Sequence, residues 1–287
     1  MAQLIDGKAL AKKTRGNVKE IVEKMKTKPG LAVVMVGDDP ASKIYVSSKE
    51  KACIEVGMYS EKVILPENTS EEEVLKTIHR LNNDKKINGI LVQVPLPKHL
   101  TESVIIDAIC VEKDVDCFHK YNLGQLLVAD EHTNANELIV PCTPKGIIEM
   151  IESTGQSIAG KKAVVVGRSN IVGKPIAILL LEKNATVTVC HSRTKDLKAE
   201  TLTADILVAA VGRPNFITGD MIKKGAIVID AGINRTDKGI VGDVDFVQCS
   251  QVAGYITPVP GGVGPMTIAC LIENTLLLAK KGASLKK

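Results

Sequence analysis

The sequence predicts the α/β class, with two α/β domains that follow one another along the chain. Two observations support this class. Short runs rich in Val, Ile and Leu alternate with amphipathic stretches over the whole length, and the runs lack the apolar-polar alternation of half-exposed strands. Such runs indicate parallel strands that helices cover on both faces. A chain of 287 residues is long enough for two domains of ordinary size.

The first half of the chain supplies three strands and three helices. One helix begins after Asp39 and Pro40, which favour a helix start, and ends at Gly57, which favours a helix stop. Another opens with Ser70 and Glu73 in the spacing of a capping box. The predicted strands cover residues 31–36, 62–65 and 89–94, and the predicted helices cover residues 7–26, 41–56 and 71–82.

The second half repeats this scheme after a loop-like region over residues 114–140, which is rich in Gly, Asn, Asp and His. A helix then starts with Thr143 as its N-cap and Pro144 in its first turn, and it stops near Gly155. A final helix over residues 265–281 is followed by no strand. The remaining predicted elements are strands over 163–166, 186–190, 206–211 and 226–230, and a helix over 176–181.

Composition excludes several classes of function. The net charge of +4 is mild, and aromatic residues make up only 2%, so neither a basic stripe nor interleaved aromatics suggest nucleic-acid binding. Seven scattered cysteines without a C-x-x-C pair indicate reduced thiols of a cytosolic protein rather than disulfides or a zinc site. The N-terminus lacks a signal peptide's pattern, and no window approaches the roughly 18 continuous apolar residues of a membrane span. We therefore expect a cytoplasmic protein with no membrane, nucleic-acid or metal partner.

Lys49 lies on the apolar face of the helix predicted over residues 41–56. At about 100° per residue it falls among Tyr45, Val46 and Cys53, whereas the other charged residues face away. One interpretation is a lysine that lays its stem along apolar surface and lifts its ammonium into water. The other is a lysine at the floor of a cleft, with Tyr45 as a stacking or hydrogen-bonding partner. The helix alone leaves both open.

A glycine-rich turn between Gly167 and Pro175 joins the strand over 163–166 to the next helix. Such a turn brings backbone N–H groups and a helix N-terminus up to a phosphate. It is not a P-loop, because five residues separate its glycines and Pro175 replaces the magnesium-binding Ser or Thr. Nor is it a strict G-x-G-x-x-G, so a plain tight turn stays open as an alternative.

The following strand indicates NADP rather than NAD. An NAD site places a carboxylate at the end of this strand for the ribose hydroxyl, but the strand over 186–190 runs into His191-Ser192-Arg193 without an acid. Arg168, Ser192 and Arg193 instead suit a 2′-phosphate, at about 1.5–3 kcal/mol per charge-assisted hydrogen bond. A basic but solvated loop is the alternative. Later turns at Gly212, Gly232 and Ile233 share the same sheet edge, where the ligand of a doubly wound sheet lies.

Six motifs complete the pattern. They are Ser42-x-x-Tyr45-Val46-x-x-Lys49-x-Lys51, Gln93-Val94-Pro95-Leu96-Pro97, Lys113-Asp114-Val115-Asp116, Pro141-Cys142-Thr143-Pro144, Gly167-Arg168-Ser169-x-Ile171-Val172-Gly173-x-Pro175 and Pro258-Val259-Pro260-Gly261-Gly262-Val263-Gly264-Pro265-Met266-Thr267. With these motifs the chain resembles, over nearly its whole length, the bifunctional methylenetetrahydrofolate dehydrogenase / methenyltetrahydrofolate cyclohydrolase family of the bacterial FolD type.

The resemblance implies two reactions. The first is an NADP-linked oxidation of 5,10-methylenetetrahydrofolate to the methenyl cation, and the second is hydration of that cation to 10-formyltetrahydrofolate. It further implies a homodimer with one cleft between a folate-binding catalytic domain and a Rossmann-like NADP-binding domain. The expected boundaries are residues 1–118, joined by the returning helix over about 264–287, for the catalytic domain, and 119–263 for the Rossmann-like domain.

The same resemblance assigns the site residues. The expected catalytic residues are Lys49, Gln93, Tyr45 and Asp116, and the expected folate-binding residues are these four with Val94, Pro260 and Gly261. The expected NADP-binding residues are Gly167, Arg168, Ser169, Ile171, Val172, Ser192, Arg193, Gly212, Gly232 and Ile233.

A mechanism follows as a hypothesis. Burial favours a neutral amine, so Lys49 would activate or orient the attacking water, and Gln93 would hold the amine in place. Tyr45 would stack on the aminobenzoyl ring, or else only pack. Asp116 would accept two hydrogen bonds from the pterin, or else only shape a turn. The dehydrogenase step needs no proton removed, so positioning should dominate it.

Cys117 departs from the glycine that the family usually has after Asp116. If that position needs φ > 0, Cys strains the turn that aims Asp116. Three rival functions stay open: a dehydrogenase without cyclohydrolase, a silent nucleotide-binding regulator, and an enzyme that uses NAD. Lys49, Gln93 and Arg168 argue against the first two, and the missing acid after Cys190 argues against the third.

Overall fold

The computed structural model describes residues 1–129, 138–237 and 239–284. The chain forms two compact units, each with its own parallel sheet. The six-stranded unit comprises Met1–Lys12 and Pro141–Thr267, and the three-stranded unit comprises Lys13–Val140 and Ile268–Lys287. The predicted fold class, two α/β domains, is confirmed.

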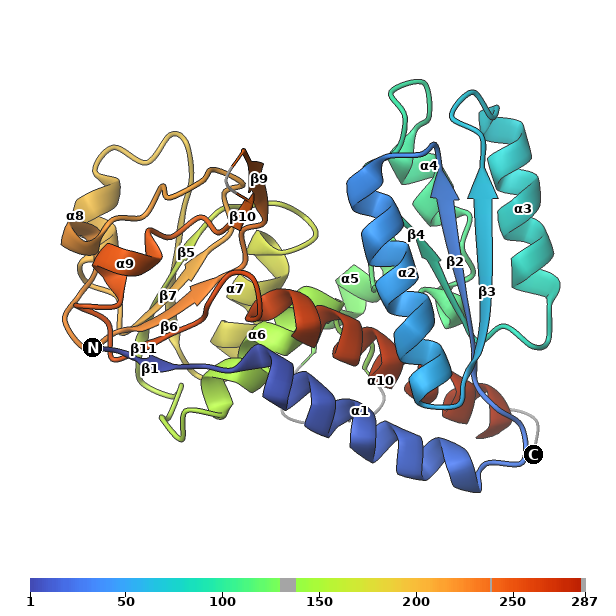
Figure 1. The fold of residues 1–287 in the computed structure, drawn as a ribbon, viewed down its shortest axis with the longest axis horizontal. Coiled ribbons are helices and arrows are strands. Elements are labelled where there is room, and N and C mark those ends of the chain that lie inside the picture. Colours follow the sequence, from blue (N-terminus) through green and yellow to red (C-terminus); the bar gives the residue numbers. More distant parts are fainter. Residues whose placement is uncertain (130–137, 238, 285–287) are drawn as a thin grey trace. The chain divides into compact units, whose positions relative to one another are not determined.

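The three-stranded unit is a sheet in the order β3-β2-β4, with β2 in the centre (Figure 1). In β2 every residue is buried, and Val34 pairs with Val63 on one side and Val92 on the other. The chain leaves β2 first for β3 and then crosses back to β4, so right-handed crossovers put α2 and α3 on opposite faces. Its elements are β2 (Gly30–Val36), α2 (Pro40–Glu55), β3 (Tyr59–Leu65), α3 (Glu71–Asn83), β4 (Gly89–Val92), α4 (Glu102–Asp107), η1 (Val111–Lys113) and α5 (Lys120–Leu127).

One hydrophobic cluster of this unit lies between the sheet and α3 with α4. Val74, Ile78 and Leu81 of α3 meet Val34 and Ile90 of the sheet, and all five are fully buried. The capping box at Ser70 is present, as predicted. Edge strand β3 is only partly buried, because one of its sides has no neighbouring strand among the described residues.

The sheet of the six-stranded unit has the strand order β1-β11-β8-β7-β5-β6, and all pairings within this sheet are parallel. The hairpin of β9 and β10 forms a separate antiparallel pair. The chain runs from β5 to β6 and then crosses to β7 on the other side of β5, so the strand order reverses at β5. Its elements are β1 (Gln3–Leu4), α6 (Cys142–Glu152), β5 (Lys162–Val166), α7 (Gly173–Glu182), β6 (Thr186–Cys190), α8 (Leu197–Thr201), β7 (Ile206–Ala209), η2 (Gly219–Met221), β8 (Ile227–Asp230), β9 (Asn234–Thr236), β10 (Gly239–Val241), α9 (Phe246–Cys249) and β11 (Tyr255–Ile256).

Two long helices, α1 (Gly7–Lys24) and α10 (Val263–Ser284), begin in the six-stranded unit and continue in the three-stranded unit. Part of α10, Val263–Ala283, is long and apolar enough to cross a membrane by length and composition, although its sequence has no continuous apolar run of 18 residues. Of its most apolar 18-residue window, 61% is buried within the protein, as in the core helix of a folded domain.

Two local predictions were wrong. Thr143 is not the N-cap of its helix: α6 starts at Cys142 after Pro141, and the Thr143 hydroxyl shares a hydrogen bond of 3.0 Å with that of Thr267. The loop-like region over 114–140 contains α5, whose N-cap His119 accepts through Nδ1 from the N–H of Tyr121. Part of that region, residues 130–137, lies outside the described residues. The two-residue strands β1 and β11 were not predicted, because two residues are too short for a pattern.

Candidate active site

Lys49 is buried in the three-stranded unit. It sits in the middle of α2, which Asp39 caps by accepting from the N–H of Ser42 at 2.7 Å. Only 8% of Lys49 is exposed, and its Nζ donates to Oε1 of Gln93 at 3.0 Å. The interpretation as a lysine with its ammonium in water is therefore wrong.

Gln93 is held at both its backbone and its side chain. It follows β4, its N–H donates to the carbonyl of Val34 in β2 at 2.8 Å, and its own Nε2 donates to the carbonyl of Val94 at 2.7 Å. Because Nε2 is committed to that carbonyl, Oε1 is the atom presented to Lys49. The pair lies at the carboxyl ends of β2 and β4, where the strand order reverses and ligands of open α/β sheets bind.

The two aspartates after η1 differ in their surroundings. Asp114 is 1% exposed and accepts hydrogen bonds from the N–H groups of Phe118 and His119 at 3.1 and 2.9 Å. It also accepts from Nδ2 of Asn122 at 2.8 Å. Burial raises the pKa of Asp114 despite these donors. Asp114 is thus the carboxylate that shapes the turn, which argues against a metal ion held by Asp114 together with Asp116.

Asp116 and Tyr45 are half-buried in the same unit. Asp114 forms a parallel bridge with Ile90 of β4, so the chain through Asp116 runs beside the strand that leads to Gln93. Tyr45 precedes Lys49 by one helical turn, on the same face of α2. The sheet and α2 therefore direct these residues to one edge of the unit.

Cys117 adopts φ = 59°, the left-handed conformation that glycine tolerates best. Its thiol is fully buried and donates to the carbonyl of Ile139 at 3.1 Å. Burial raises the pKa of this thiol, with Asp114 as a further cause. The side chain that strains the backbone thus also fills space and makes a hydrogen bond.

Pro260 and Gly261 lie in the six-stranded unit, in a loop that is packed backbone against backbone. Gly261 has φ = 111°, and a Cβ added at Gly7 at the start of α1 would lie 2.0 Å from the carbonyl oxygen of Gly262. Gly7 is therefore required by the close approach of this loop, and Gly261 is favoured by its positive φ.

The predicted phosphate turn after β5 is compact. Gly167 has φ = 129°, and a Cβ there would lie 2.1 Å from the carbonyl oxygen of Ala210. The Ser169 hydroxyl accepts from the N–H groups of Val172 and Gly173, both at 3.2 Å, at the start of α7. The turn thus brings the beginning of α7 to the carboxyl edge of the sheet.

A hollow of about 310 Å³ opens at this edge. It combines apolar walls with two arginines, and none of the described residues that line it is acidic. This donor set fits a nucleotide that carries phosphates. The lining residues are Val166, Gly167, Arg168, Ser169, His191, Ser192, Leu197, Ala210, Val211, Arg213 and Phe216.

The hollow includes four of the ten predicted cofactor residues, namely Gly167, Arg168, Ser169 and Ser192. The other six do not line it; they are Ile171, Val172, Arg193, Gly212, Gly232 and Ile233. Sequence reasoning missed His191 and Arg213, although both stand in turns that it singled out.

The turn after β6 is fixed by its own hydrogen bonds. His191 N–H donates to the Thr194 hydroxyl at 2.9 Å, and His191 Nδ1 accepts from the N–H of Arg193 at 3.1 Å. Because Nδ1 accepts, the neutral imidazole carries its hydrogen on Nε2.

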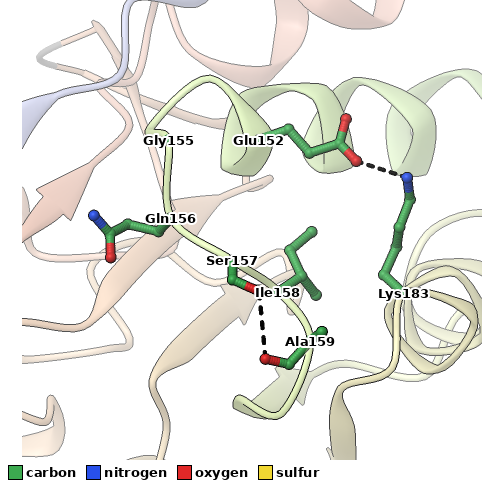
Figure 2. Close-up of a pocket in the computed structure, with 7 residues that line it drawn as sticks. All are labelled: Glu152, Gly155, Gln156, Ser157, Ile158, Ala159 and Lys183. Atoms are coloured by element: carbon green, nitrogen blue, oxygen red, sulfur yellow. Dashed lines mark hydrogen bonds and ion pairs between the residues drawn. The ribbon is translucent and has the colours of Figure 1, made fainter.

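A second hollow, of about 430 Å³, lies at the opposite, amino edge of the same sheet (Figure 2). Its two charged residues, Glu152 and Lys183, pair with each other at 2.7 Å. Ligands of such sheets bind at the carboxyl edge, so this hollow is not a candidate for the cofactor. Its lining residues are Glu152, Gly155, Gln156, Ser157, Ile158, Ala159 and Lys183.

Comparisons with known proteins cover nearly the whole chain. The family model "Tetrahydrofolate dehydrogenase/cyclohydrolase, catalytic domain" matches residues 5–116, and its counterpart for the "NAD(P)-binding domain" matches residues 141–283. "Bifunctional protein FolD" of Moorella thermoacetica is 57% identical over 284 residues, which cover 98% of this chain and 99% of the relative.

Solved structures agree. The bifunctional FolD enzyme from Campylobacter jejuni superposes with a TM-score of 0.93 at 47% identity, covering 98% of this chain and 100% of that one. The Trypanosoma brucei dehydrogenase-cyclohydrolase, complexed with NADP cofactor and inhibitor, gives a TM-score of 0.93 at 39% identity, with 98% of each chain covered.

Proposed function

This chain belongs to the tetrahydrofolate dehydrogenase/cyclohydrolase family, and from that premise we propose which of its residues perform the two reactions. It is a bifunctional enzyme that oxidises 5,10-methylenetetrahydrofolate with NADP and hydrolyses 5,10-methenyltetrahydrofolate. The observation that carries our assignment of the second reaction is the hydrogen bond that the buried Lys49 donates to Gln93.

Lys49 is the general base of the hydrolysis. Water adds to the methenyl carbon, a C–O bond forms, and the Lys49 amine takes one proton from the water. The bond from that carbon to N5 then breaks, and N5 receives the remaining hydroxyl proton. The products are 10-formyltetrahydrofolate and one proton on Lys49, which solvent removes. Gln93 keeps the amine aimed at the water, because its own Nε2 is anchored to Val94.

The dehydrogenase step depends on positioning. When bound, NADP supplies the acceptor for the hydride that leaves the methylene carbon. No proton has to be removed, so Lys49 is dispensable for this chemistry. Tyr45 stacks on the aminobenzoyl ring, and Asp116 accepts two hydrogen bonds from the pterin edge. Asp114 holds the turn that carries Asp116, by accepting from the N–H groups of Phe118 and His119. Val94, Pro260 and Gly261 complete the folate-binding residues.

Arg168 and Ser192 set the preference for NADP over NAD by holding the 2′-phosphate. Support comes from their places in the hollow and from the absence of acids among its described lining residues. Arg193 and the turns at Gly212 and Gly232 complete the cofactor site.

We further propose a homodimer that works in the cytoplasm. Edge strand β3 and the adjoining α2 expose Ile44, Ile54, Tyr59 and Ile64, which are 58%, 66%, 43% and 52% exposed. An apolar edge strand is a ready pairing surface for a second copy. The seven cysteines are all free thiols, as in a reducing compartment. Sedimentation of the purified protein tests the dimer; a monomer at micromolar concentration would refute it.

A single time course tests the function. Purified protein receives 5,10-methylenetetrahydrofolate and NADP, and NADPH and methenyltetrahydrofolate are followed separately, with NAD in a parallel reaction. We expect NADPH to rise while methenyltetrahydrofolate stays low and 10-formyltetrahydrofolate accumulates. Methenyltetrahydrofolate rising in step with NADPH, without hydration above background, would leave only the dehydrogenase.

A further inference from the structure

Asp243 is a buried carboxylate behind the nucleotide hollow, and it is 0% exposed. Its Oδ2 accepts hydrogen bonds from the N–H groups of Val211 and Gly212 at 2.6 and 2.9 Å, and its Oδ1 accepts from the N–H of Arg213 at 3.0 Å. Oδ1 also accepts from Nδ2 of Asn234 at 2.8 Å. One side chain thus binds three consecutive N–H groups of the turn that follows β7.

A second buried carboxylate holds Asp243 in place. Asp230 lies at the end of β8. Its Oδ1 accepts hydrogen bonds from the N–H groups of Gly232 and Asp243, and its Oδ2 accepts one from the N–H of Val244, each at 2.9 Å. A Cβ at Gly242 would lie 1.8 Å from Asp230 Oδ2, so this glycine leaves the room that the carboxylate needs. The two aspartates therefore tie together the turns after β7 and β8.

The turn that Asp243 holds forms one wall of the hollow. Val211 and Arg213 both line it, and the Arg213 guanidinium lies 4.4 Å from the ring centroid of Phe216, a third lining residue. Asp243 does not line the hollow. Its influence on a bound nucleotide therefore passes through the turn.

We propose that Asp243 is a positioning residue for cofactor binding, because its carboxylate sets the Val211–Arg213 wall of the nucleotide hollow. The inference rests on the NADP-linked function proposed above. In the sheet order, β7 and β6 lie on opposite sides of β5. Since the 2′-phosphate is assigned to the β6 side, the β7 turn meets the part of the cofactor that NADP and NAD share.

The test is Asp243→Asn, which keeps the shape but replaces one acceptor oxygen with an amide that opposes N–H donors. The chain has no Trp, so binding is followed through the fluorescence of NADPH and NADH themselves. We expect both dissociation constants to rise by similar factors, about tenfold to a hundredfold.

Asp245→Asn is the matched control. Asp245 lies two residues away and caps α9 by accepting from the N–H of Gln248 at 3.1 Å, but it does not touch the turn. Its variant should bind both nucleotides as the wild type does. Hydrolysis of methenyltetrahydrofolate should be unchanged in both variants, since Lys49 lies in the other unit and this reaction needs no cofactor.

Several results would overturn the inference. They are unchanged dissociation constants in Asp243→Asn, a loss confined to NADPH, or a parallel loss of hydrolysis in a folded variant. If Asp243→Asn does not fold, Arg213→Gln replaces it as the test, because it alters the same wall at an exposed position. Unchanged binding of both nucleotides would then overturn the inference. A wild type that binds neither nucleotide would overturn the proposed function as well.

Discussion

Lys49 and Arg168 are both basic side chains at the carboxyl edge of a parallel sheet, but their surroundings differ. Lys49 is buried, and its amine is held by Gln93, whose amide is itself anchored. Arg168 is exposed on the rim of the nucleotide hollow, and what is fixed there is the backbone of the turn. The first arrangement holds one atom in place for chemistry, whereas the second presents donors to a ligand that supplies the remaining contacts.

This difference indicates how each region should respond to change. A group that moves a proton must be placed to a fraction of an ångström, so losing it should remove one reaction. At a phosphate-binding rim, several hydrogen-bond donors each contribute part of the binding free energy. The loss of one donor should therefore weaken affinity without abolishing it. The predictions on Lys49 and Arg168 test this contrast directly, and those on Asp230 and Cys117 test two further groups that burial fixes; the four are given from the largest expected effect to the smallest.

Lys49→Met should slow hydrolysis of methenyltetrahydrofolate by about a hundredfold to ten-thousandfold, the usual contribution of a positioned general base. NADPH binding should not change. Stopped-flow absorbance of methenyltetrahydrofolate measures the rate. The control is Lys43→Met on the exposed face of the same helix, which should hydrolyse normally. A Lys49→Met enzyme within threefold of the wild type would remove the contrast.

Asp230→Asn tests the buried carboxylates of the six-stranded unit. Burial raises the pKa of Asp230 to about 6 from its ordinary 3.8, so the native state binds this proton more tightly than the unfolded state. Ionisation of Asp230 therefore lowers stability as pH rises from 3.8 to 6, by up to about 3 kcal/mol.

Urea titrations from pH 7 down to pH 4.5 measure this effect. The wild type should gain stability relative to Asp230→Asn as the pH falls, since the amide cannot take up a proton. Parallel stability curves for the two proteins would show that Asp230 is ionised throughout.

Arg168→Gln should raise the KM for NADP by about tenfold to a hundredfold and leave that for NAD nearly unchanged. Hydrolysis should be unaffected. Initial rates with each nucleotide measure the effect. An equal rise for both nucleotides would place Arg168 on a part of the cofactor that the two share.

Cys117→Gly and Cys117→Ala form a matched pair. Both lose the buried thiol, but only Gly relieves the left-handed conformation at φ = 59°. We expect the Gly variant to be more stable than the Ala variant by about 1 kcal/mol, seen as a higher midpoint of thermal unfolding. Equal midpoints would mean that the turn relaxes without cost.

Much of this structure was predictable because its signals are local. The apolar runs that became β2, β4, β5, β7 and β8 are buried along nearly their whole length, and burial on both faces gives a continuous apolar pattern in the sequence. Lys49 was noticed because a charge on an apolar helical face is unusual. The prediction of NADP likewise rests on the few residues that directly follow β6, because none of them is acidic.

The features that were missed depend on contacts between distant segments. Asp243 looks like an ordinary loop acid until the fold brings it to the N–H groups of Val211–Arg213, about 30 residues earlier in the chain. Strand β1 exists because β11 lies beside it, and two residues carry no periodicity. The roles of Asp114 and Asp116 were separable only once the donors to Asp114 were seen.

The most direct test of the account is a coupled time course with Lys49→Met, 5,10-methylenetetrahydrofolate and NADP. If Lys49 is the base of the hydrolysis alone, NADPH should still form and methenyltetrahydrofolate should accumulate with it mole for mole. If NADPH formation and hydrolysis are lost together while the variant still binds folate, Lys49 is not a general base for one step, and the central claim is contradicted.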